Sequence, residues 1–301
     1  MGKPQGRLQV VATPIGNMND VSSRAREALE GADAIAAEDT RRTLALLESI
    51  GISRPLLSLH EHNESRRVPE ILARLARGET VALVSDAGTP LLSDPGFELV
   101  RGAIDGGFTV EPIPGPSAVT AALAVAGLPV SRFCFEGFLP ARQSERRAQL
   151  ARLADEPRTM VFFEAPHRIA ATLADAAAEL GDERPAVVAR ELTKAHETLY
   201  RGPLGTLARR ALEEENFRRG ELTVLVGGAP AVEGGVDAAL LRRAVDLLSK
   251  ELAPGRAAAV AAQLTGATRA EAYALVQRRT RPSAENDALD APEPLPDPPD
   301  P

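Results

Sequence analysis

The sequence predicts an α/β protein with two α/β domains and a small helical module behind them. Short apolar runs alternate with helical patterns from residue 8 to residue 127, which is typical of a parallel sheet covered by helices. The same alternation starts again after Gly127-Leu128-Pro129, which we take as a domain boundary. A last, all-helical segment follows the linker Glu233-Gly234-Gly235.

The first predicted domain covers residues 1–128. Its strands are expected at residues 8–11, 34–37, 56–59, 80–84 and 109–113. Ser22 can cap the first helix, and Gly31, Gly51 and Gly78 stand where helices are expected to stop. Two further helices are expected at residues 96–104 and 117–126. The order of the elements predicts a parallel sheet for this domain.

The second predicted domain covers residues 129–230. Its strands are expected at residues 133–135, 159–163, 186–190, 197–200 and 221–226, and its helices at 143–154, 168–180 and 204–215. The late strands follow one another closely along the chain. Since parallel neighbours need long crossovers, this spacing predicts partly antiparallel pairing.

Residues 237–280 read as three short helices, and Thr268 with Glu271 matches a capping box at the start of the last one. This module resembles a helix-turn-helix, but a helical add-on that packs on the body or on a partner protein fits equally well. Residues 281–301 hold seven prolines and six acidic residues. That composition predicts a disordered acidic tail.

The composition excludes several classes of protein. A single cysteine, Cys134, rules out an internal disulfide framework and fits a reducing compartment. No apolar stretch approaches the roughly 20 residues that span a bilayer, and no signal peptide follows Met1. The net charge of −7 argues against a general nucleic-acid coat, although residues 237–280 carry +3. We expect a soluble, cytoplasmic protein without membrane contact.

Familiar phosphate, dinucleotide and zinc motifs are absent from the sequence. It has no G-x-x-x-x-G-K-[ST], no G-x-G-x-x-G after the first strand, and no H-E-x-x-H or paired C-x-x-C. His60-Glu61-His62 could bind a metal, but hydrated imidazoles at a strand end are the commoner explanation. We therefore expect no metal site.

Two turns that follow apolar strands predict a small-molecule pocket. The first is Ser85-Asp86-Ala87-Gly88-Thr89-Pro90, and the second is Pro114-Gly115-Pro116-Ser117-Ala118. In open α/β sheets, ligands bind at the carboxyl ends of the strands. Asp86 could accept hydrogen bonds from ligand hydroxyls or an ammonium, or it could form an Asx turn. Ser117 could cap its helix, or the N–H groups beside it could face a ligand carboxylate.

Three further strand ends carry residues suited to a site. Pro14 and Gly16 form a tight turn after the first strand, Glu164 follows the apolar run Met160–Phe163, and Lys194 ends Arg190-Glu191-Leu192-Thr193-Lys194. Strand ends are where sites form in such sheets. Structural salt bridges are the alternative explanation for each charged residue.

Taken together, several segments resemble the tetrapyrrole-methylase superfamily and, within it, the branch of small-subunit ribosomal RNA ribose 2′-O-methyltransferases. These segments are Val10–Asn17, Ala37–Arg41, Ser85–Pro90 with Ser93–Gly96, Pro114–Ser117, Phe163–Arg168 and Arg190–Lys194. The resemblance covers residues 8–228 in order. It implies two α/β domains with the active site in the cleft between them, and a homodimer.

The resemblance also implies S-adenosylmethionine as the methyl donor and a cytidine ribose in the decoding region of small-subunit ribosomal RNA as the acceptor. The residues that it places at the cofactor are Pro14, Ile15, Asp86, Ala87, Gly88, Thr89, Pro90, Ser117 and Ala118. The ribose hydroxyl is a weak nucleophile that benefits from a base or a nearby cation. Candidates for that role are Lys194, Asp39, Glu38 and Glu164. Candidates for phosphate contact are Arg41, Arg42, Arg142, Arg146 and Arg147, together with the helical module.

Two other functions remain open at this point. A tetrapyrrole C-methyltransferase would need the same cofactor pocket but no basic surface. A non-enzymatic nucleic-acid-binding protein would use the helical module, and it would leave the two pocket-forming turns without a purpose.

Overall fold

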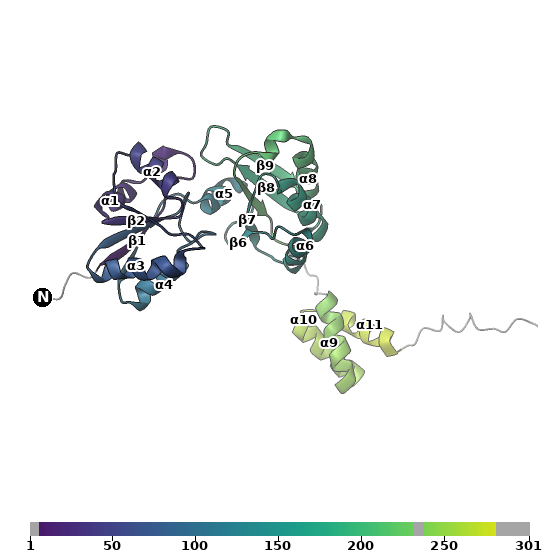
Figure 1. Ribbon diagram of the computed structural model, residues 1–301. Coiled ribbons are helices and arrows are strands. Elements are labelled where there is room, and N and C mark those ends of the chain that lie inside the picture. Colours follow the sequence, from purple (N-terminus) through teal and green to yellow (C-terminus); the bar gives the residue numbers. More distant parts are fainter. Residues whose placement is uncertain (1–5, 231–237, 281–301) are drawn as a thin grey trace, which may run out of the picture. The chain divides into compact units, whose positions relative to one another are not determined.

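The computed structural model describes residues 6–230 and 238–280 (Figure 1). They divide into two compact units, an α/β unit that ends at Ala229 and a helical unit that follows it. The α/β unit contains two five-stranded sheets. The predicted α/β class is confirmed.

The first sheet is wholly parallel, with strand order β3-β2-β4-β1-β5. Its strands are β1 (Arg7–Val11), β2 (Ala34–Ala37), β3 (Leu56–Ser58), β4 (Thr80–Val84) and β5 (Thr109–Ile113). Its helices are α1 (Ser23–Gly31), α2 (Thr40–Ser49), α3 (Glu64–Ala76) and α4 (Phe97–Asp105), with a short 3-10 turn η1 (Met18–Asp20). Two separate apolar cores bury the sheet. One lies between the sheet and helices α1 and α2, and the other lies between the opposite face and helices α3 and α4. Because all five strands run the same way, the turns after β1, β2, β4 and β5 meet at one edge.

The second sheet has strand order β6-β7-β10-β8-β9 and is mixed. Its strands are β6 (Phe133–Phe138), β7 (Thr159–Glu164), β8 (Pro185–Arg190), β9 (Thr198–Pro203) and β10 (Leu222–Val226). Only β6 and β7 pair in parallel, and the other neighbours are antiparallel. The predicted antiparallel pairing of the late strands is confirmed.

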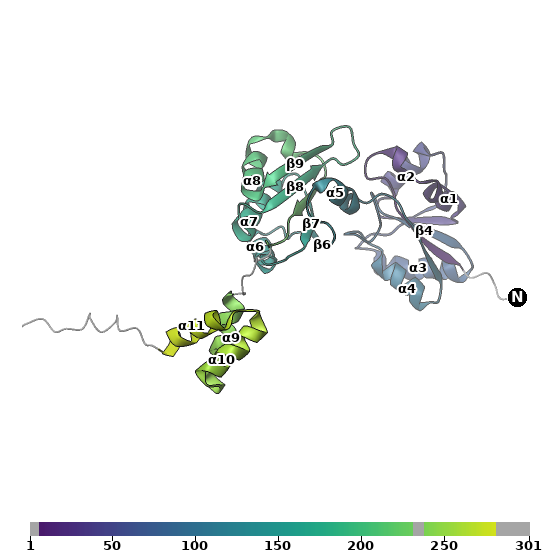
Figure 2. The same cartoon turned by 180° about the vertical axis from the view of Figure 1, so that it is seen from behind.

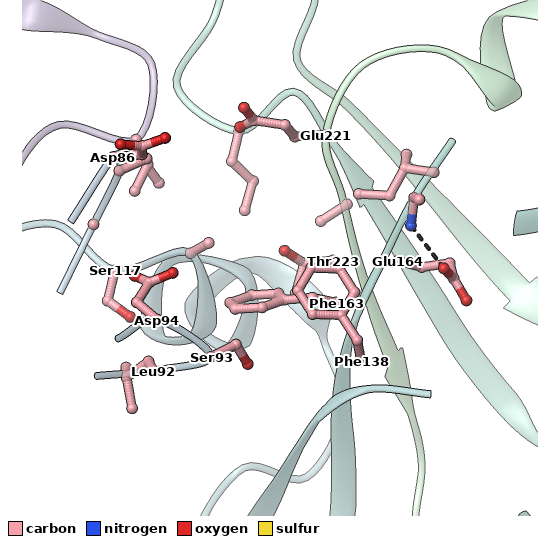
Figure 3. A pocket seen from close by; sticks show the side chains of 18 of the residues that line it. Asp86, Leu92, Ser93, Asp94, Ser117, Phe138, Phe163, Glu164, Glu221 and Thr223 are labelled. Atoms are coloured by element: carbon pink, nitrogen blue, oxygen red, sulfur yellow. Dashed lines mark hydrogen bonds between the residues drawn. The ribbon is translucent and has the colours of Figure 1, made fainter. Parts of the chain in front are cut away.

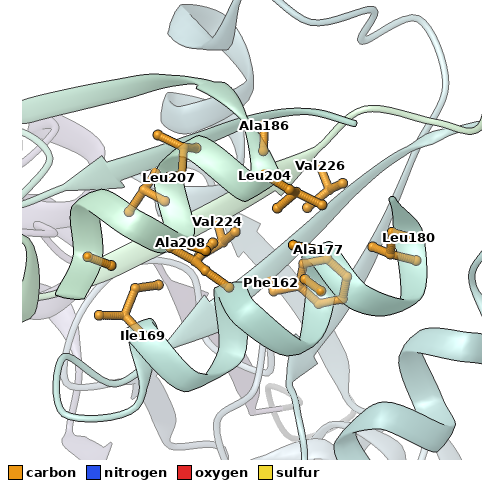
Figure 4. Close-up of a cluster of buried hydrophobic side chains, with 14 of the residues drawn as sticks. Phe162, Ile169, Ala177, Leu180, Ala186, Leu204, Leu207, Ala208, Val224 and Val226 are labelled. Atoms are coloured by element: carbon orange, nitrogen blue, oxygen red, sulfur yellow. The ribbon is translucent and has the colours of Figure 1, made fainter. Parts of the chain in front are cut away.

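One face of the second sheet is covered by α6 (Gln143–Arg152), α7 (Ile169–Leu180) and α8 (Leu204–Glu213), with the 3-10 turn η2 (Glu215–Arg218) beside them (Figure 2). Phe162 and Val224 of the sheet meet Ile169, Leu204 and Leu207 of the helices in this core (Figure 4). The opposite face is therefore free to pack against another element.

Helix α5 (Ala118–Ala126) is that element. It directly follows β5 of the first sheet in the chain, yet Val119, Ala122 and Leu123 are buried against Val161 and Leu225 of the second sheet. The sequence of α5 is apolar almost all round, which is typical of a helix covered on several sides. The helix therefore ties the two sheets into one unit.

Strand β6 runs three residues beyond its predicted end at residue 135. The apolar run stops there because Glu136 and Gly137 follow, but the chain forms a β-bulge and continues pairing to Phe138. Gly137 takes a φ of +66°, a backbone conformation that favours glycine.

The helical unit consists of α9 (Ala238–Glu251), α10 (Pro254–Thr265) and α11 (Arg269–Thr280). Its small core is built mainly from Leu241, Val245, Ala258, Ala261 and Val276. The predicted capping box is present, since the Thr268 hydroxyl accepts from the Glu271 N–H and Glu271 accepts from the Thr268 N–H. The predicted disordered tail, residues 281–301, lies outside the described residues.

None of the helices described in residues 6–230 and 238–280 combines the length and the apolar character needed to cross a membrane.

Candidate functional site

A cavity of about 420 Å³ opens at the edge where the strands of the first sheet end, and it is also lined by the second sheet (Figure 3). From the first sheet and its turns come Ile15, Glu38, Arg42, Asp86, Ala87, Gly88, Thr89, Leu92, Ser93 and Asp94. Ser117 and Ala118 line it from the start of α5. From the second sheet and its loops come Phe138, Phe163, Glu164, Ala165, Pro166, Ala189, Leu192, Gly220, Glu221, Leu222 and Thr223.

The turns after β1 and β4 are fastened to each other by backbone hydrogen bonds. Thr13 N–H donates to the Gly88 carbonyl at 2.8 Å, and Gly88 N–H donates to the Thr13 carbonyl at 3.0 Å. Gly88 has a φ of +81°, and a Cβ there would lie 3.2 Å from Ile15 Cγ2. The glycine therefore allows this turn to lie directly against Ile15 at the cavity wall.

The start of α5 presents backbone N–H groups to the cavity. Ser117 is the N-cap residue, but its hydroxyl makes no capping hydrogen bond. The turn is held instead by Thr89, whose hydroxyl donates to the Pro116 carbonyl at 3.1 Å. Because first-turn N–H groups have no partners inside their helix, this end of α5 suits an anionic group.

Three carboxylates form the polar side of the cavity: Glu38, Asp86 and Asp94. Asp86 accepts a hydrogen bond from the Asp39 N–H at 3.0 Å and forms an ion pair with Arg42 at 3.1 Å. Burial, followed by the charges of Asp94 and Asp86, raises the pKa of Glu38. Burial also raises the pKa of Asp94, with a further contribution from Asp86. The cavity therefore favours a ligand that carries positive charge.

Of the four predicted catalytic residues, Glu38 lines the cavity, where a hydrogen bond from the Asp86 backbone and the charge of Arg42 oppose the rise in its pKa. Asp39 does not line it: the Asp39 carboxylate caps α2 and pairs with Arg41, and the hydrogen bonds from Arg41 lower its pKa to about 2.

Glu164 is among the residues that line the cavity, but its carboxylate is held by neighbouring residues. Its carboxylate accepts a hydrogen bond from the Ala165 N–H at 2.7 Å (Figure 3). It also accepts one from Thr172 at 2.5 Å and lies 3.2 Å from Arg168. The side chain is 1% exposed. A carboxylate held in this way is structural and is a poor candidate for a base.

Lys194 lies behind the cavity wall. Its ammonium is 2.9 Å from Glu191 and 3.0 Å from Glu221, and its stem lies directly against Gly16. Burial alone would lower the pKa of Lys194, but the hydrogen bonds that its ammonium donates to Glu191 and Glu221 outweigh burial and raise it. A charged and paired ammonium of this kind is a poor candidate for a base.

Most of the predicted cofactor residues are brought together. Ile15, Asp86, Ala87, Gly88, Thr89, Ser117 and Ala118 all line the cavity. Pro14 and Pro90 are buried in the turns behind it and are not among its lining residues.

Asp94 and Phe138 were missed as site residues. Asp94 stands in Ser93-Asp94-Pro95-Gly96, whose turn composition signalled a loop and gave no sign of burial. Phe138 was missed because the strand was expected to end at residue 135, before Gly137, the glycine at the bulge.

The predicted phosphate contacts lie in different surroundings. Arg42 lines the cavity, and Arg41 is exposed beside Asp39. Arg142 is exposed, and Arg147 is half-exposed and pairs with Glu179 at 2.6 Å. These four can reach an external ligand.

The surroundings of Arg146 disfavour its predicted contact with phosphate. Its side chain is 5% exposed and forms an ion pair with the equally buried Asp175 at 2.6 Å, and its guanidinium also donates to the Pro140 and Ala141 carbonyls. Contact with RNA would require breaking a buried charge pair, which is strongly unfavourable. Arg146 is a structural residue of the second core.

Within residues 6–230 and 238–280, no group of three His, Cys, Asp or Glu side chains could hold a metal ion. The rings of His60 and His62 stand edge to face with centroids 5.9 Å apart.

Cys134 is partly buried, and burial raises its pKa to about 11, so its thiol is a poor nucleophile.

Comparison with known proteins gives a consistent result for sequence and fold. The family described as Tetrapyrrole (Corrin/Porphyrin) Methylases matches residues 7–208. A protein of Xylella fastidiosa named "Ribosomal RNA small subunit methyltransferase I" is 53% identical over 271 residues, covering 89% of this chain and 98% of that protein. Proteins of the same name from Pseudomonas aeruginosa and Escherichia coli are 51% and 48% identical, over 87% and 89% of this chain.

Solved structures share the fold at much lower identity. A cobalt precorrin-4 methyltransferase covers 75% of this chain with a TM-score of 0.56 at 19% identity. A diphthine synthase covers 73% of this chain with a TM-score of 0.54 at 16% identity. At these identities the likeness concerns the fold alone.

Proposed function

Because this chain belongs to the tetrapyrrole methylase family, we propose that it methylates the ribose 2′-hydroxyl of a cytidine in the decoding region of small-subunit ribosomal RNA, with S-adenosylmethionine as donor. The observation that carries the proposal is the match to relatives named as small-subunit ribosomal RNA methyltransferases. It extends over 87–89% of this chain and 93–98% of theirs at 48–53% identity. The tetrapyrrole C-methyltransferase alternative has the family match and a likeness of fold in its favour, but the precorrin methyltransferase structure is only 19% identical to this chain.

The residues around the cavity fit S-adenosylmethionine. Its volume of about 420 Å³ lies in the range of small-molecule sites. The carboxylates of Glu38, Asp86 and Asp94 suit a cation and sugar hydroxyls, and the start of α5 suits a carboxylate. Leu192 and Phe163 supply an apolar surface for a purine.

S-adenosylmethionine supplies, when bound, a methyl group that is already activated by its positive sulfur. The protein then has to orient donor and acceptor and to accept one proton. We assign that proton to Glu38, which lines the cavity and whose raised pKa brings it closer to neutral pH. Asp94 acts on Glu38 by its charge and so helps to set that pKa.

The basic side chains at and near the cavity would hold the RNA. Arg42 lines the cavity, and Arg41 is exposed next to it in the chain, so both can contact phosphates beside the acceptor nucleotide. Arg142 and Arg147 extend the basic surface on α6 and its cap. We further propose that the protein acts in the cytoplasm as a homodimer.

The proposal is tested in two steps. Calorimetry should show binding of S-adenosylmethionine to the purified protein. Labelled donor should then transfer its methyl group to small subunits that lack the modification, and nucleoside mapping should place the label on a cytidine ribose. Label on a base, or on a porphyrinoid in preference to subunits, would reject the proposed acceptor.

A further inference from the structure

The bulge in β6 changes which face of the second sheet Phe138 occupies. Before it, Phe135 lies opposite Val161 of β7; after it, Gly137 lies opposite Phe162, and Phe138 lies opposite Phe163. Cross-strand partners share a face, and one extra residue moves the following side chains to the other face. In a regular strand Phe138 would lie opposite Glu164 and would point to the helix-covered side. The bulge turns it toward the cavity.

Phe138 is exposed at the cavity. The residue is 54% exposed, and of the three exposed phenylalanines Phe97, Phe133 and Phe138 it is the one that lines the cavity. Part of the ring packs on Phe163, with centroids 5.6 Å apart at a tilt of 57°, and the rest is open.

The cavity wall has an enclosed part and an open part. Ala189, Leu192 and Leu222 are nearly fully buried, so they can contact only a ligand that is itself enclosed. Phe138 and Leu92 are exposed at the opening, where they can meet a ligand that arrives from solvent. Figure 3 shows Phe138 and Phe163 across the cavity from Asp86 and Ser117.

A nucleotide that enters a cavity of this kind comes from a single-stranded segment or leaves its stack. Its unstacked base then needs a new surface. Proteins supply it with aromatic rings, on which single-stranded bases stack. An exposed ring beside the carboxylate side of the cavity meets this need.

We propose that Phe138 is the stacking platform for the base of the acceptor nucleotide. This inference rests on the proposed function, and it makes Phe138 a positioning residue. The ring holds the base while the ribose hydroxyl faces the carboxylate side of the cavity. The purine of S-adenosylmethionine then packs against the enclosed part of the cavity wall at Leu192.

The first test uses Phe138→Trp, which becomes the single tryptophan of the chain. A short single-stranded RNA containing the acceptor cytidine, added with S-adenosylhomocysteine, should quench its fluorescence. The same RNA with an abasic acceptor nucleotide should not. Phe133→Trp is the matched control, since Phe133 lies on the same strand, is 42% exposed and does not line the cavity. Equal quenching by S-adenosylhomocysteine alone would mean that the ring meets the donor's adenine, and would overturn the proposal.

The second test measures methyl transfer to small subunits. Phe138→Ala should lower kcat/KM roughly tenfold through the loss of stacking, and Phe138→Tyr should restore it. The dissociation constant for S-adenosylmethionine should stay within about twofold in calorimetry. Phe97→Ala, on the exposed side of α4, is the control for loss of a surface ring. Unchanged kcat/KM in Phe138→Ala overturns this inference alone, whereas absence of donor binding in the unmodified protein overturns the proposed function.

Discussion

Arg42 and Asp86 form an ion pair of 3.1 Å at the cavity. Arg42 is the third residue after the cap of α2, and Asp86 belongs to the turn after β4. Arg42 is 68% exposed, whereas Asp86 is 21% exposed. The pair therefore joins a residue that can reach RNA to one that can reach the donor. An ion pair with an exposed member contributes little to stability, so Arg42 can be altered without unfolding the protein.

Arg42→Ala should weaken the binding of subunits and reduce the salt dependence of that binding. Loss of one phosphate contact lowers the slope of log affinity against log salt by about one. Subunit affinity measured across a salt series checks this. Arg101→Ala, an exposed arginine of α4, should leave the slope unchanged. A slope that Arg42→Ala does not alter would remove Arg42 from the RNA contacts.

Glu38→Gln should abolish the acid limb of the pH–rate profile. In the unmodified protein, kcat/KM should rise with pH as Glu38 loses its proton, with an inflection above the ordinary value for glutamate because its pKa is raised. Loss of a general base lowers the rate about 10²- to 10⁴-fold. A Glu38→Gln variant that keeps the acid limb would assign the base to another group.

Glu38→Gln should also raise the melting temperature at neutral pH. A carboxyl group whose folded pKa is raised holds its proton more tightly in the folded state, so its contribution to stability is present at low pH and is lost as pH rises through that pKa. The gain in Tm should therefore be larger at pH 7 than at pH 4, as scanning calorimetry can show. A gain that is larger at low pH would contradict the sign of the shift.

Lys194→Met should lower stability and leave the pH profile in place. The variant keeps the stem against Gly16 but leaves the carboxylates of Glu191 and Glu221 without their shared cation. Tm should fall, and any loss of activity should be the same at every pH. Disappearance of a titration step would show that Lys194 takes part in proton transfer.

Arg146→Ala should destabilise the protein by about 3–5 kcal/mol, because it leaves Asp175 buried without its partner. Arg142→Ala, four residues earlier and 82% exposed, should change the free energy of unfolding by less than about 0.5 kcal/mol. Denaturant titrations of the two variants make the comparison. Equal stability of both would mean that the Arg146 pair does not hold the second core.

The sequence predicted the strands and helices well because each carries its own local pattern. The turns at Thr13, Asp86 and Ser117 were found in the same way, since parallel strands bring their carboxyl ends to one edge. The burial of Arg146 was not predictable, because it depends on Asp175, which is 29 residues away along the chain. The places of Asp94 and Phe138 at the cavity depend on loop burial and on a bulge. Loop burial leaves no local signal, and Gly137 is the local sign of the bulge.

The packing of α5 on the second sheet has a consequence for how this protein can be divided. A fragment that ends at Gly127 would expose the apolar side chains of α5 to solvent and would be prone to aggregate. A fragment that begins at Gly127 would expose Val161 and Leu225 of the second sheet. The two sheets are thus mutually dependent for their solubility. A recombination that replaces one sheet, in the laboratory or in evolution, has to keep α5 together with the second sheet. The chain therefore has to be cut before Ser117.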